Sequence, residues 1–477
     1  MTPFQASKSS HAFDIKTKIY QKDNFKPVET EMSESEDVRI EMHSNQSEPA
    51  DNVNHGYARE WEFCIQQYET VQISERKRKM EKVPPLLLKG EKGARNRQCY
   101  EPAVISLGPY HHKRDDLVAA EKYKLITLEE YCLICKNTMD SLYNKVFEVV
   151  QDARKCYVDG STDEYNDEQF TGMMLRDGCF VLFFIYCIAT EPNTMLMLNI
   201  EYLGTSGFLH IVGDILLLEN QIPFIVLQVL LDMQFPEDRG ERILNEFFNY
   251  LNYGKITTKK KKVLEMKQPL HLLELYRSHF ISLGVHQKNT SGIWNYVKRN
   301  QSFPSVNELK AKGIFLKRTN VDDESYNEDI NFHSYCCYGE LEVVQRAVYE
   351  NSKAIYLNMI AYESCPYNPN DLRVSTYIRL MKSLVVHHDD VKELRDNNIL
   401  HHSFRRDEEV VKMYDEIDVP LVNVHVFNQL RRGIENHCNN KYKTWAAELI
   451  TIYFSTPWKT VSLGVAILGL ILTVIKM

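Results

Sequence analysis

One stretch of eighteen residues, Asp214 to Leu231, constrains the fold because it is strongly apolar yet polar at its centre. Its length is close to the roughly 20 apolar residues that a membrane-spanning helix needs. Residues 219–223, Glu-Asn-Gln-Ile-Pro, interrupt it, and one carboxylate at the centre of a span costs about 3 kcal/mol. We therefore interpret the stretch as two buried helices joined at a polar corner.

Two residues of this corner fit the start of its second helix. Asn220 is predicted to be the N-cap, because an asparagine side chain accepts a hydrogen bond from the first unpaired N–H groups of a helix. Pro223 is expected in the first turn, where a missing N–H costs little. The apolar positions on either side are expected to face the core: Leu216, Leu217, Val226, Leu227, Leu230 and Leu231.

Length and charge allow a large core and give no indication of a nucleic-acid partner. The chain has 477 residues, 44% of them hydrophobic and 26% charged, and a formal net charge of −8. These values are ordinary for globular proteins, whereas nucleic-acid-binding domains are usually basic. The 11 cysteines are scattered, and this odd number predicts reduced thiols in a cytosolic compartment.

Composition divides the chain into three predicted parts. Residues 1–56 are expected to be a disordered acidic leader, because residues 29–51 hold eight acidic residues, one basic residue and no aromatic one. The N-terminus has no apolar run, which argues against a signal peptide. Residues 57–455 are expected to form a single large helical domain, and residues 456–477 a C-terminal transmembrane anchor.

The body is expected to be mainly α, with a small β element near residues 314–334. Apolar spacing predicts a long helix from Asp115 to Val150. The uncharged run Cys179–Ala189 is too short to span a membrane and fits a buried helix, with Arg176 and Asp177 as an ion pair at its edge. Alternating residues predict strands, and apolar spacing predicts further helices; the strands are Ile314–Thr319 and Ile330–Ser334, and the helices are residues 353–363 and 374–397.

The last apolar segment, Val461 to Ile475, contains no charged residue. With its flanks, Trp458 to Lys476, it would form roughly 28 Å of helix, which matches a thin bilayer. Four basic residues upstream (431, 432, 441 and 443) favour a cytosolic body. We expect a single-pass membrane protein with most of the chain cytosolic, and a buried terminal helix is the alternative. Transmembrane positions would include Val461, Leu463, Ile467, Leu470 and Ile475.

Histidine pairs are the strongest candidates for chemistry. His111 and His112 follow a Gly-Pro turn at residues 108–109, and His387-His388 precedes two aspartates. A metal site needs three or four ligands in fixed geometry, and adjacent side chains point in different directions. Structural hydrogen bonding is therefore favoured, and Asp389 is interpreted as the N-cap of a following helix. The alternative is a metal-dependent or thiol enzyme that uses His111/His112, His387/His388 or Cys179.

No sequence motif indicates a cofactor. Cys132 and Cys135 form a lone CxxC, whereas a zinc site usually needs a second pair. The sequence has no phosphate-binding GxxxxGK[ST] or GxGxxG motif and no GxSxG motif. We therefore predict no catalytic residue, no cofactor, no metal and no small-molecule substrate. The basic run at residues 259–262 is interpreted as a solvated loop rather than a nuclear signal or a lipid-binding patch.

Seven segments, in a fixed order from about Val83 onwards, resemble the plant domain-of-unknown-function 247 family, whose members are UPF0481-like proteins. They are Pro102-Ala-Val-Ile-Ser-Leu-Gly-Pro-Tyr-His-His112, Met174-Leu-Arg-Asp-Gly-Cys-Phe-Val181, Asp214-Ile-Leu-Leu-Leu-Glu-Asn-Gln-Ile-Pro-Phe224, Glu308-Leu-Lys-Ala-Lys-Gly-Ile-Phe315, Leu357-Asn-Met-Ile-Ala-Tyr-Glu363, Asp389-Asp-Val-Lys-Glu-Leu394 and Tyr453-Phe-Ser-Thr-Pro-Trp458. Each segment is short, and their order over most of the chain makes the resemblance specific.

The resemblance implies a plant protein that is mostly helical and carries a C-terminal membrane helix. No catalytic residue is established for the family, and some members are genetically associated with self-incompatibility in grasses. We therefore expect a membrane-anchored recognition or signalling protein that binds a protein partner and has no enzymatic activity, and the resemblance suggests self-incompatibility as its role. Structural roles are expected for the matching motif residues: Gly108, Pro109, Tyr110, His111, His112, Asp177, Gly178, Glu219, Asn220, Gln221 and Pro223.

Three positions depart from the family pattern. The family usually has Gly after the paired histidines, where this chain has Lys113. A Glu commonly follows the apolar residues after Asp-Gly-Cys-Phe, where this chain has Phe183 and Phe184. A Met often precedes Glu121, where this chain has Ala120. These changes indicate a divergent member.

Overall fold

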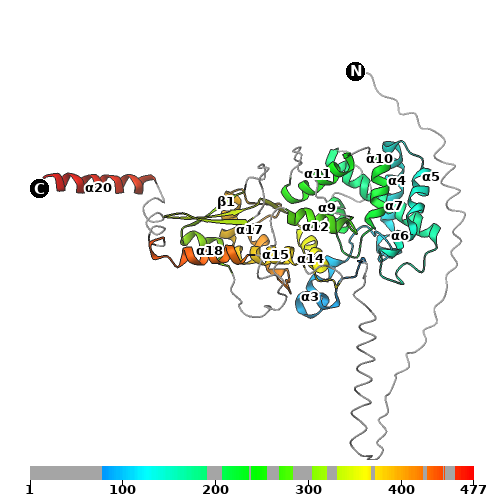
Figure 1. Ribbon diagram of the computed structural model, residues 1–477, viewed down its shortest axis with the longest axis horizontal. Coiled ribbons are helices and arrows are strands. Elements are labelled where there is room, and N and C mark those ends of the chain that lie inside the picture. The colour runs from blue at the N-terminus through cyan, green and yellow to red at the C-terminus, as the bar shows by residue number, and fades with distance from the viewer. Residues whose placement is uncertain are drawn as a thin grey trace, which may run out of the picture. The chain divides into compact units, whose positions relative to one another are not determined.

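The computed structural model describes most of the chain from Arg78 onwards, and what it describes is mostly helical (Figure 1). The described residues are 78–190, 207–235, 238–254, 268–282, 303–319, 330–366, 371–422, 427–443, 445 and 457–476. The predicted leader at residues 1–56 and the basic run at residues 259–262 lie outside these ranges. Those two assignments stay predictions.

Helices dominate the first half of the described chain. Their bounds are η1 Pro85–Leu88, α3 Gly90–Asn96, η2 Arg97–Tyr100, η3 Asp115–Leu117, α4 Val118–Cys135, α5 Met139–Glu148, α6 Val150–Lys155, α7 Asp167–Thr190, α9 Gly207–Asp214, α10 Phe224–Gln234, α11 Arg239–Tyr253 and α12 Leu272–Ser282.

The single helix predicted from residue 115 to residue 150 is wrong. Helix α4 ends at Cys135, because the next residue, Lys136, has a left-handed backbone with φ 53° and a left-handed residue stops a right-handed helix. A new helix, α5, then begins after Thr138, whose hydroxyl accepts a hydrogen bond from Ser141 N at 3.2 Å. Apolar spacing continues across the break, so spacing alone did not reveal it.

Helix α7 lies at the centre of the N-terminal helices and packs against α4, α5, α10 and α11 (Figure 1). Among the described helices it is the one that is long and apolar enough to cross a bilayer, but 83% of its most apolar window is buried inside the protein. The prediction of a buried helix at residues 179–189 is therefore confirmed, as part of a longer helix.

The described stretch 214–231 contains one helix and not the two that were predicted, because its first half, residues 215–223, is not helical. Helix α9 ends at Asp214, residues 215–223 form turns, and α10 begins at Phe224. The N-cap prediction for Asn220 is wrong, because Pro223 occupies the N-cap position of α10. Pro223 therefore precedes the first turn, in which it was predicted to lie. All six apolar residues predicted to face the core are buried: Leu216, Leu217, Val226, Leu227, Leu230 and Leu231.

The predicted β element is a three-stranded sheet. Strand β1, Ile314–Arg318, follows Gly313, whose φ of +73° suits the residue after a helix end. Strand β2, Ile330–Ser334, has the predicted bounds. Strand β3, Gly339–Val343, was not predicted and lies between them, parallel to β1 and antiparallel to β2.

The remaining elements in the described ranges are a second, two-stranded sheet and seven helices. Strand β4, Arg346–Val348, pairs in parallel with β5, Leu400–His402. The helices are α13 Val306–Ala311, α14 Ser352–Glu363, α15 Arg373–Leu384, α16 His388–Asp396, α17 Asp407–Glu416, α18 Asn428–Cys438 and α20 Pro457–Lys476.

Two predictions in this half need correction. The helix predicted at residues 374–397 is two helices, α15 and α16, separated by Val385–His387. The N-cap position of α16 belongs to His387 rather than to Asp389, and the side chain of Asp390 accepts the His387 N–H at 2.8 Å. Asp390 also accepts Asn307 N at 2.8 Å, so this carboxylate joins α16 to α13.

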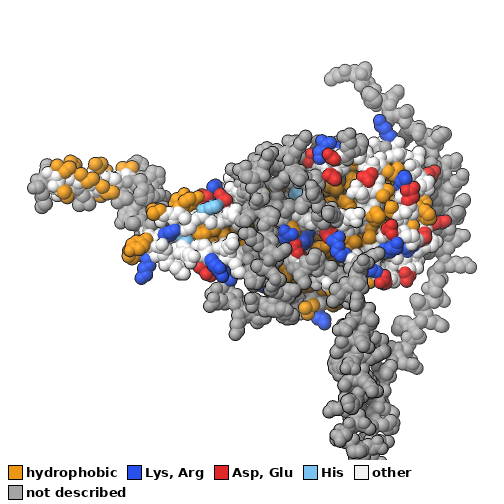
Figure 2. Space-filling model, in the orientation of Figure 1, with side chains coloured by type: hydrophobic (Ala, Val, Ile, Leu, Met, Phe, Trp, Pro, Cys, Tyr) orange, Lys and Arg blue, Asp and Glu red, His pale blue; other side chains and the backbone are white. Residues whose placement is uncertain are grey.

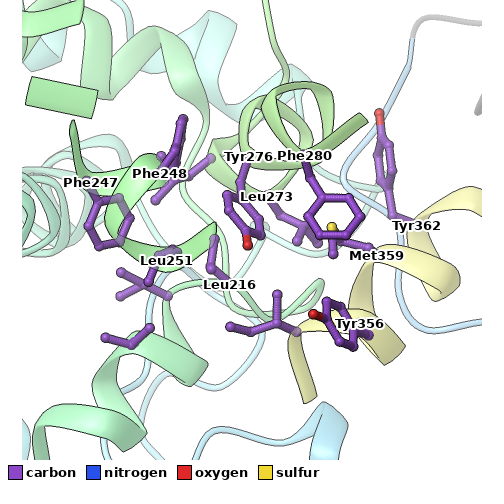
Figure 3. Close-up of a cluster of buried hydrophobic side chains, with 14 of the residues drawn as sticks. Leu216, Phe247, Phe248, Leu251, Leu273, Tyr276, Phe280, Tyr356, Met359 and Tyr362 are labelled. Atoms are coloured by element: carbon purple, nitrogen blue, oxygen red, sulfur yellow. The ribbon is translucent and has the colours of Figure 1, made fainter. Parts of the chain in front are cut away.

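Buried apolar side chains form one core cluster that extends through most of the described helices. Figure 3 shows a part of it where α11, α12 and α14 meet the corner. The labelled side chains are Leu216, Phe247, Phe248, Leu251, Leu273, Tyr276, Phe280, Tyr356, Met359 and Tyr362. None of the nine cysteines whose side chains are described forms a disulfide, so apolar packing holds these helices together.

Candidate functional site

The corner, defined here as residues 214–223, binds the extended segment 102–112 through side chains. Asp214 Oδ1 accepts Ala103 N at 2.9 Å, and Oδ2 accepts Val104 N at 2.7 Å and Ile105 N at 2.9 Å. Segment 102–112 belongs to no described β-ladder. Its backbone groups still need partners when buried, and the Asp214 carboxylate supplies them.

Asn220 continues this pairing towards the Gly-Pro turn. Its Oδ1 accepts Leu107 N at 2.7 Å. Its Nδ2 donates to the carbonyl oxygens of Ile105 and Asp214, each at 2.9 Å. A buried amide whose donor and acceptor are both used in this way acts like a short piece of neighbouring strand.

Asp177, in the middle of α7, holds the end of the extended segment. Its Oδ2 accepts Gly108 N at 2.8 Å, and its Oδ1 lies 2.7 Å from Lys124 Nζ, which is fully buried. The predicted Arg176–Asp177 ion pair is therefore wrong. Arg176 lies instead 3.8 Å from Glu121, because adjacent residues of a helix point about 100° apart.

Two glycines allow these close approaches. Gly108 has φ +68°, and a Cβ there would lie 2.7 Å from both Gln221 O and Tyr157 Oη. The predicted turn is confirmed, and a side chain would prevent it. On α7, a Cβ at Gly178 would lie 2.6 Å from Leu230 Cδ1, so this glycine lets α7 and α10 pack closely.

The remaining corner residues bind further segments. Gln221 Nε2 donates to the carbonyl oxygens of Ile215 and Leu217, and its Oε1 accepts Leu273 N at 3.0 Å. Glu219 Oε1 accepts Val83 N at 2.8 Å. The corner thus joins the start of the described chain, the extended segment and α12.

Burial raises the pKa of Asp214 to about 6, although the three N–H donors and His210 oppose the shift. The sequence contained no sign of this, because an aspartate at a helix end is usually exposed. Asp214 is 3% exposed, and its carboxyl contacts segment 102–112.

His111 and His112 lie beside the corner in different surroundings. Burial, helped by Arg114, lowers the pKa of His111 to about 4. Burial also lowers the pKa of His112, whose ring makes an edge contact with Tyr165 at 5.7 Å between centroids. Burial therefore favours the neutral form of both imidazoles.

The other candidate residues do not join these histidines. Across the described ranges, no group of three or more His, Cys, Asp and Glu side chains could hold a metal ion. His387 begins α16, which packs against α13 and α17, and His388 is exposed near Asp389 at 3.5 Å. Cys179 is fully buried within α7.

Sequence reasoning missed a hollow of about 600 Å³ beside α10, α11 and α12. Such a volume suits a small molecule. Its apolar lining includes Phe224, Leu231, Phe235, Leu244 and Phe248. No local signal could have revealed it, because the lining combines residues from several helices and connecting segments that are far apart in the sequence.

A model of a plant protein family of unknown function, DUF247, matches residues 82–472. The chain belongs to the DUF247 family. The UPF0481 protein At3g47200 of Arabidopsis thaliana is 26% identical over 407 residues, which cover 80% of this chain and 83% of that protein. The putative UPF0481 protein At3g02645 of the same plant is 20% identical over 475 residues, covering 79% and 86% respectively. No solved structure matches.

One departure from the DUF247 pattern has a structural explanation. Lys113 stands where the family usually has Gly, and its backbone has φ +68°. Glycine adopts this left-handed conformation without a steric clash. In lysine the Cβ lies close to the following carbonyl oxygen, so the same conformation costs free energy. The Lys113 ammonium lies 4.8 Å from the ring centroid of Tyr165 and 3.7 Å from Glu164, contacts that offset part of this strain.

Proposed function

We propose that this DUF247 protein is a membrane-anchored recognition protein that binds a protein partner and performs no catalysis. The observation that carries the anchor is the exposure of apolar side chains along α20 (Figure 2). Their exposed fractions run from 47% to 74%, for Val461, Val465, Ile467, Leu468, Ile471, Leu472, Val474 and Ile475. The side chains of Leu463 and Leu470 lie outside the described set.

The length and burial energy of α20 support a bilayer as its environment. Its 20 residues form about 30 Å of helix, close to the hydrocarbon thickness of a membrane. The strongly apolar part of α20, Gly464–Ile475, is shorter than the whole helix. The less apolar residues at the ends of α20 would therefore have to complete the span. Burying eight such side chains contributes on the order of 10 kcal/mol, enough for stable anchoring.

Deleting Pro457–Met477 tests the anchor. We expect the full chain to float with membranes after extraction at alkaline pH and the shortened chain to stay in the soluble fraction. Changing Thr473 to Ser, on the same helix, serves as the matched control and should leave flotation unchanged. Membrane association of the shortened chain would contradict the anchor.

The absence of catalysis is supported by how the motif side chains are used. Asp177, Asp214 and Asn220 direct their polar atoms at backbone groups and at Lys124. A side chain that holds backbone in this way is not available to a substrate. These motif residues therefore stabilise the fold of the helical domain. Other surfaces of the protein would recognise the partner.

Partner capture and metal analysis test the recognition part. We expect affinity capture from the tissue that expresses the protein, with α20 intact, to recover a specific protein partner. Since some family members are associated with self-incompatibility, allelic forms of this chain are the first to compare. The competing hypothesis is an enzyme that uses His111/His112, His387/His388 or Cys179. Stoichiometric zinc, manganese or iron in the purified full chain would favour that enzyme.

A further inference from the structure

The hairpin that joins β2 to β3 ends in an exposed aromatic tip, Tyr335-Cys-Cys-Tyr338. Tyr335 N donates to Tyr338 O at 2.9 Å and closes the turn. The two tyrosine rings stack with centroids 4.8 Å apart, yet they remain 44% and 38% exposed. Cys336 and Cys337 between them are exposed as well.

Hydrogen bonds join this tip to the last turn of α18 and to the residues that follow it. Ser334 Oγ, at the end of β2, lies 2.8 Å from His437 Nδ1 and accepts Lys443 Nζ at 2.7 Å. Helix α18 also packs against β2. The hairpin tip and the chain around Lys443 therefore lie next to each other.

The residues around Lys443 add two more exposed aromatic side chains. Tyr442 is 81% exposed and Trp445 is 59% exposed, with ring centroids 6.0 Å apart. Within the described ranges, Phe147 on α5 is the one other aromatic side chain of comparable exposure. We name the group of Tyr335, Tyr338, Tyr442 and Trp445 the aromatic end.

The chemistry of the aromatic end suits a lipid surface. Tyrosine and tryptophan combine an apolar ring with a polar group, and they concentrate where hydrocarbon meets lipid headgroups. Residues 334–338 and 439–445 contain no acidic residue, and residues 441 and 443 are lysines. The nearby Glu340 and Glu342 both pair with Lys317, at 2.8 and 3.0 Å, so one of their two negative charges is offset.

Position along the chain also favours a membrane. Trp445 lies twelve residues before Pro457, where α20 begins. We propose that the aromatic end is a second membrane contact, which inserts into the headgroup region and holds the body against the bilayer that α20 enters. This inference rests on the proposed anchor for its setting, but it concerns different residues.

Flotation of full-length variants with phosphatidylcholine vesicles tests the aromatic end apart from the anchor. An anchor variant, Leu468→Arg with Ile471→Arg, weakens α20 without shortening the chain. We expect it to float partially. Adding Tyr335→Ser, Tyr338→Ser, Tyr442→Ser and Trp445→Ser should lower its partition coefficient by about tenfold or more, which corresponds to about 1.4 kcal/mol. Adding Phe147→Ser instead is the matched control and should change nothing.

Each outcome separates the two proposals. If the unmodified chain does not float, the anchor fails. If it floats but the anchor variant does not, the aromatic end is overturned while the anchor stands. Equal partition with and without the four serine substitutions also overturns it, provided that circular dichroism shows the same fold. Loss of a captured protein partner with unchanged flotation would instead assign this surface to a protein interface.

Discussion

At the scale of single residues, the corner depends on polar side chains that replace a missing strand. Asp214, Asn220 and Asp177 together accept the N–H groups of residues 103–105, 107 and 108. A buried N–H without an acceptor costs about 1–3 kcal/mol. Because the free energy of unfolding is typically only about 5–15 kcal/mol, loss of any one of these side chains would remove a large share of it.

Asp214 should make stability depend on pH. Its folded-state pKa of about 6 lies above its ordinary value of 3.8, so the folded state binds the proton more tightly than the unfolded state. Its contribution is therefore complete below about pH 4 and is lost as pH rises to about 6, by roughly 3 kcal/mol in total. Asp214→Asn should remove this slope, measured by denaturant unfolding at several pH values. The exposed-site control is Asp163→Asn, and an unchanged slope in Asp214→Asn would refute the assignment.

Lys113 should be a strained residue. A left-handed backbone costs a non-glycine residue about 1–2 kcal/mol. Glycine makes the unfolded chain more flexible, but this lowers the stability by less than that amount. Lys113→Gly is therefore expected to be more stable than Lys113→Ala by about 1 kcal/mol in thermal unfolding. The alanine variant is the control, because it also loses the contact with Glu164 but keeps the strain. Equal stability of the two variants would argue against strain at this position.

At the scale of elements, close packing of α7 on α10 depends on one glycine. A Cβ at Gly178 would meet Leu230, whereas a Cβ at Gly172, six residues earlier on the same helix, would meet nothing within 4 Å. The two positions therefore form a matched pair within one helix.

We expect opposite effects of alanine at these two positions. Gly172→Ala should stabilise the protein by about 0.5–1 kcal/mol through helix propensity alone. Gly178→Ala gains the same propensity but overpacks the helix crossing, which costs about 1–3 kcal/mol, so it should be less stable than Gly172→Ala. Denaturant midpoints of the two variants would measure the difference. A similar gain at both positions would show that the crossing can adjust.

Prediction of elements from the sequence succeeded where the signal was local. Strand β2 has the predicted bounds, and the six apolar residues around the corner are buried. Strand β3 was missed although Gly339-Glu-Leu-Glu-Val343 alternates polar and apolar residues, and its two glutamates pair with Lys317 of the neighbouring strand. Its extended form depends on β1 and β2, which flank it on both sides.

At the scale of the whole molecule, cysteine reactivity should follow the fold. Cys336 and Cys337 are exposed at the hairpin tip, whereas Cys179 and Cys187 are buried in α7. Maleimide labelling of the native chain, mapped by mass spectrometry, should modify the hairpin pair first and the α7 pair only with global unfolding. Labelling in denaturant provides the control for complete reaction. Early labelling of Cys179 would mean that α7 opens locally.

The stretch from residue 214 to residue 231 separates what the sequence determines from what tertiary structure decides. Hydrophobic residues at helical spacing, together with a polar interruption, were sufficient to predict buried segments meeting at a corner, because burial follows the local pattern of apolar side chains. The partners of Asp214 and Asn220 lie more than 100 residues away, in segment 102–107. Hydrogen bonding is short-ranged and directional, so which groups pair is decided only when the folded chain brings distant segments within 3 Å.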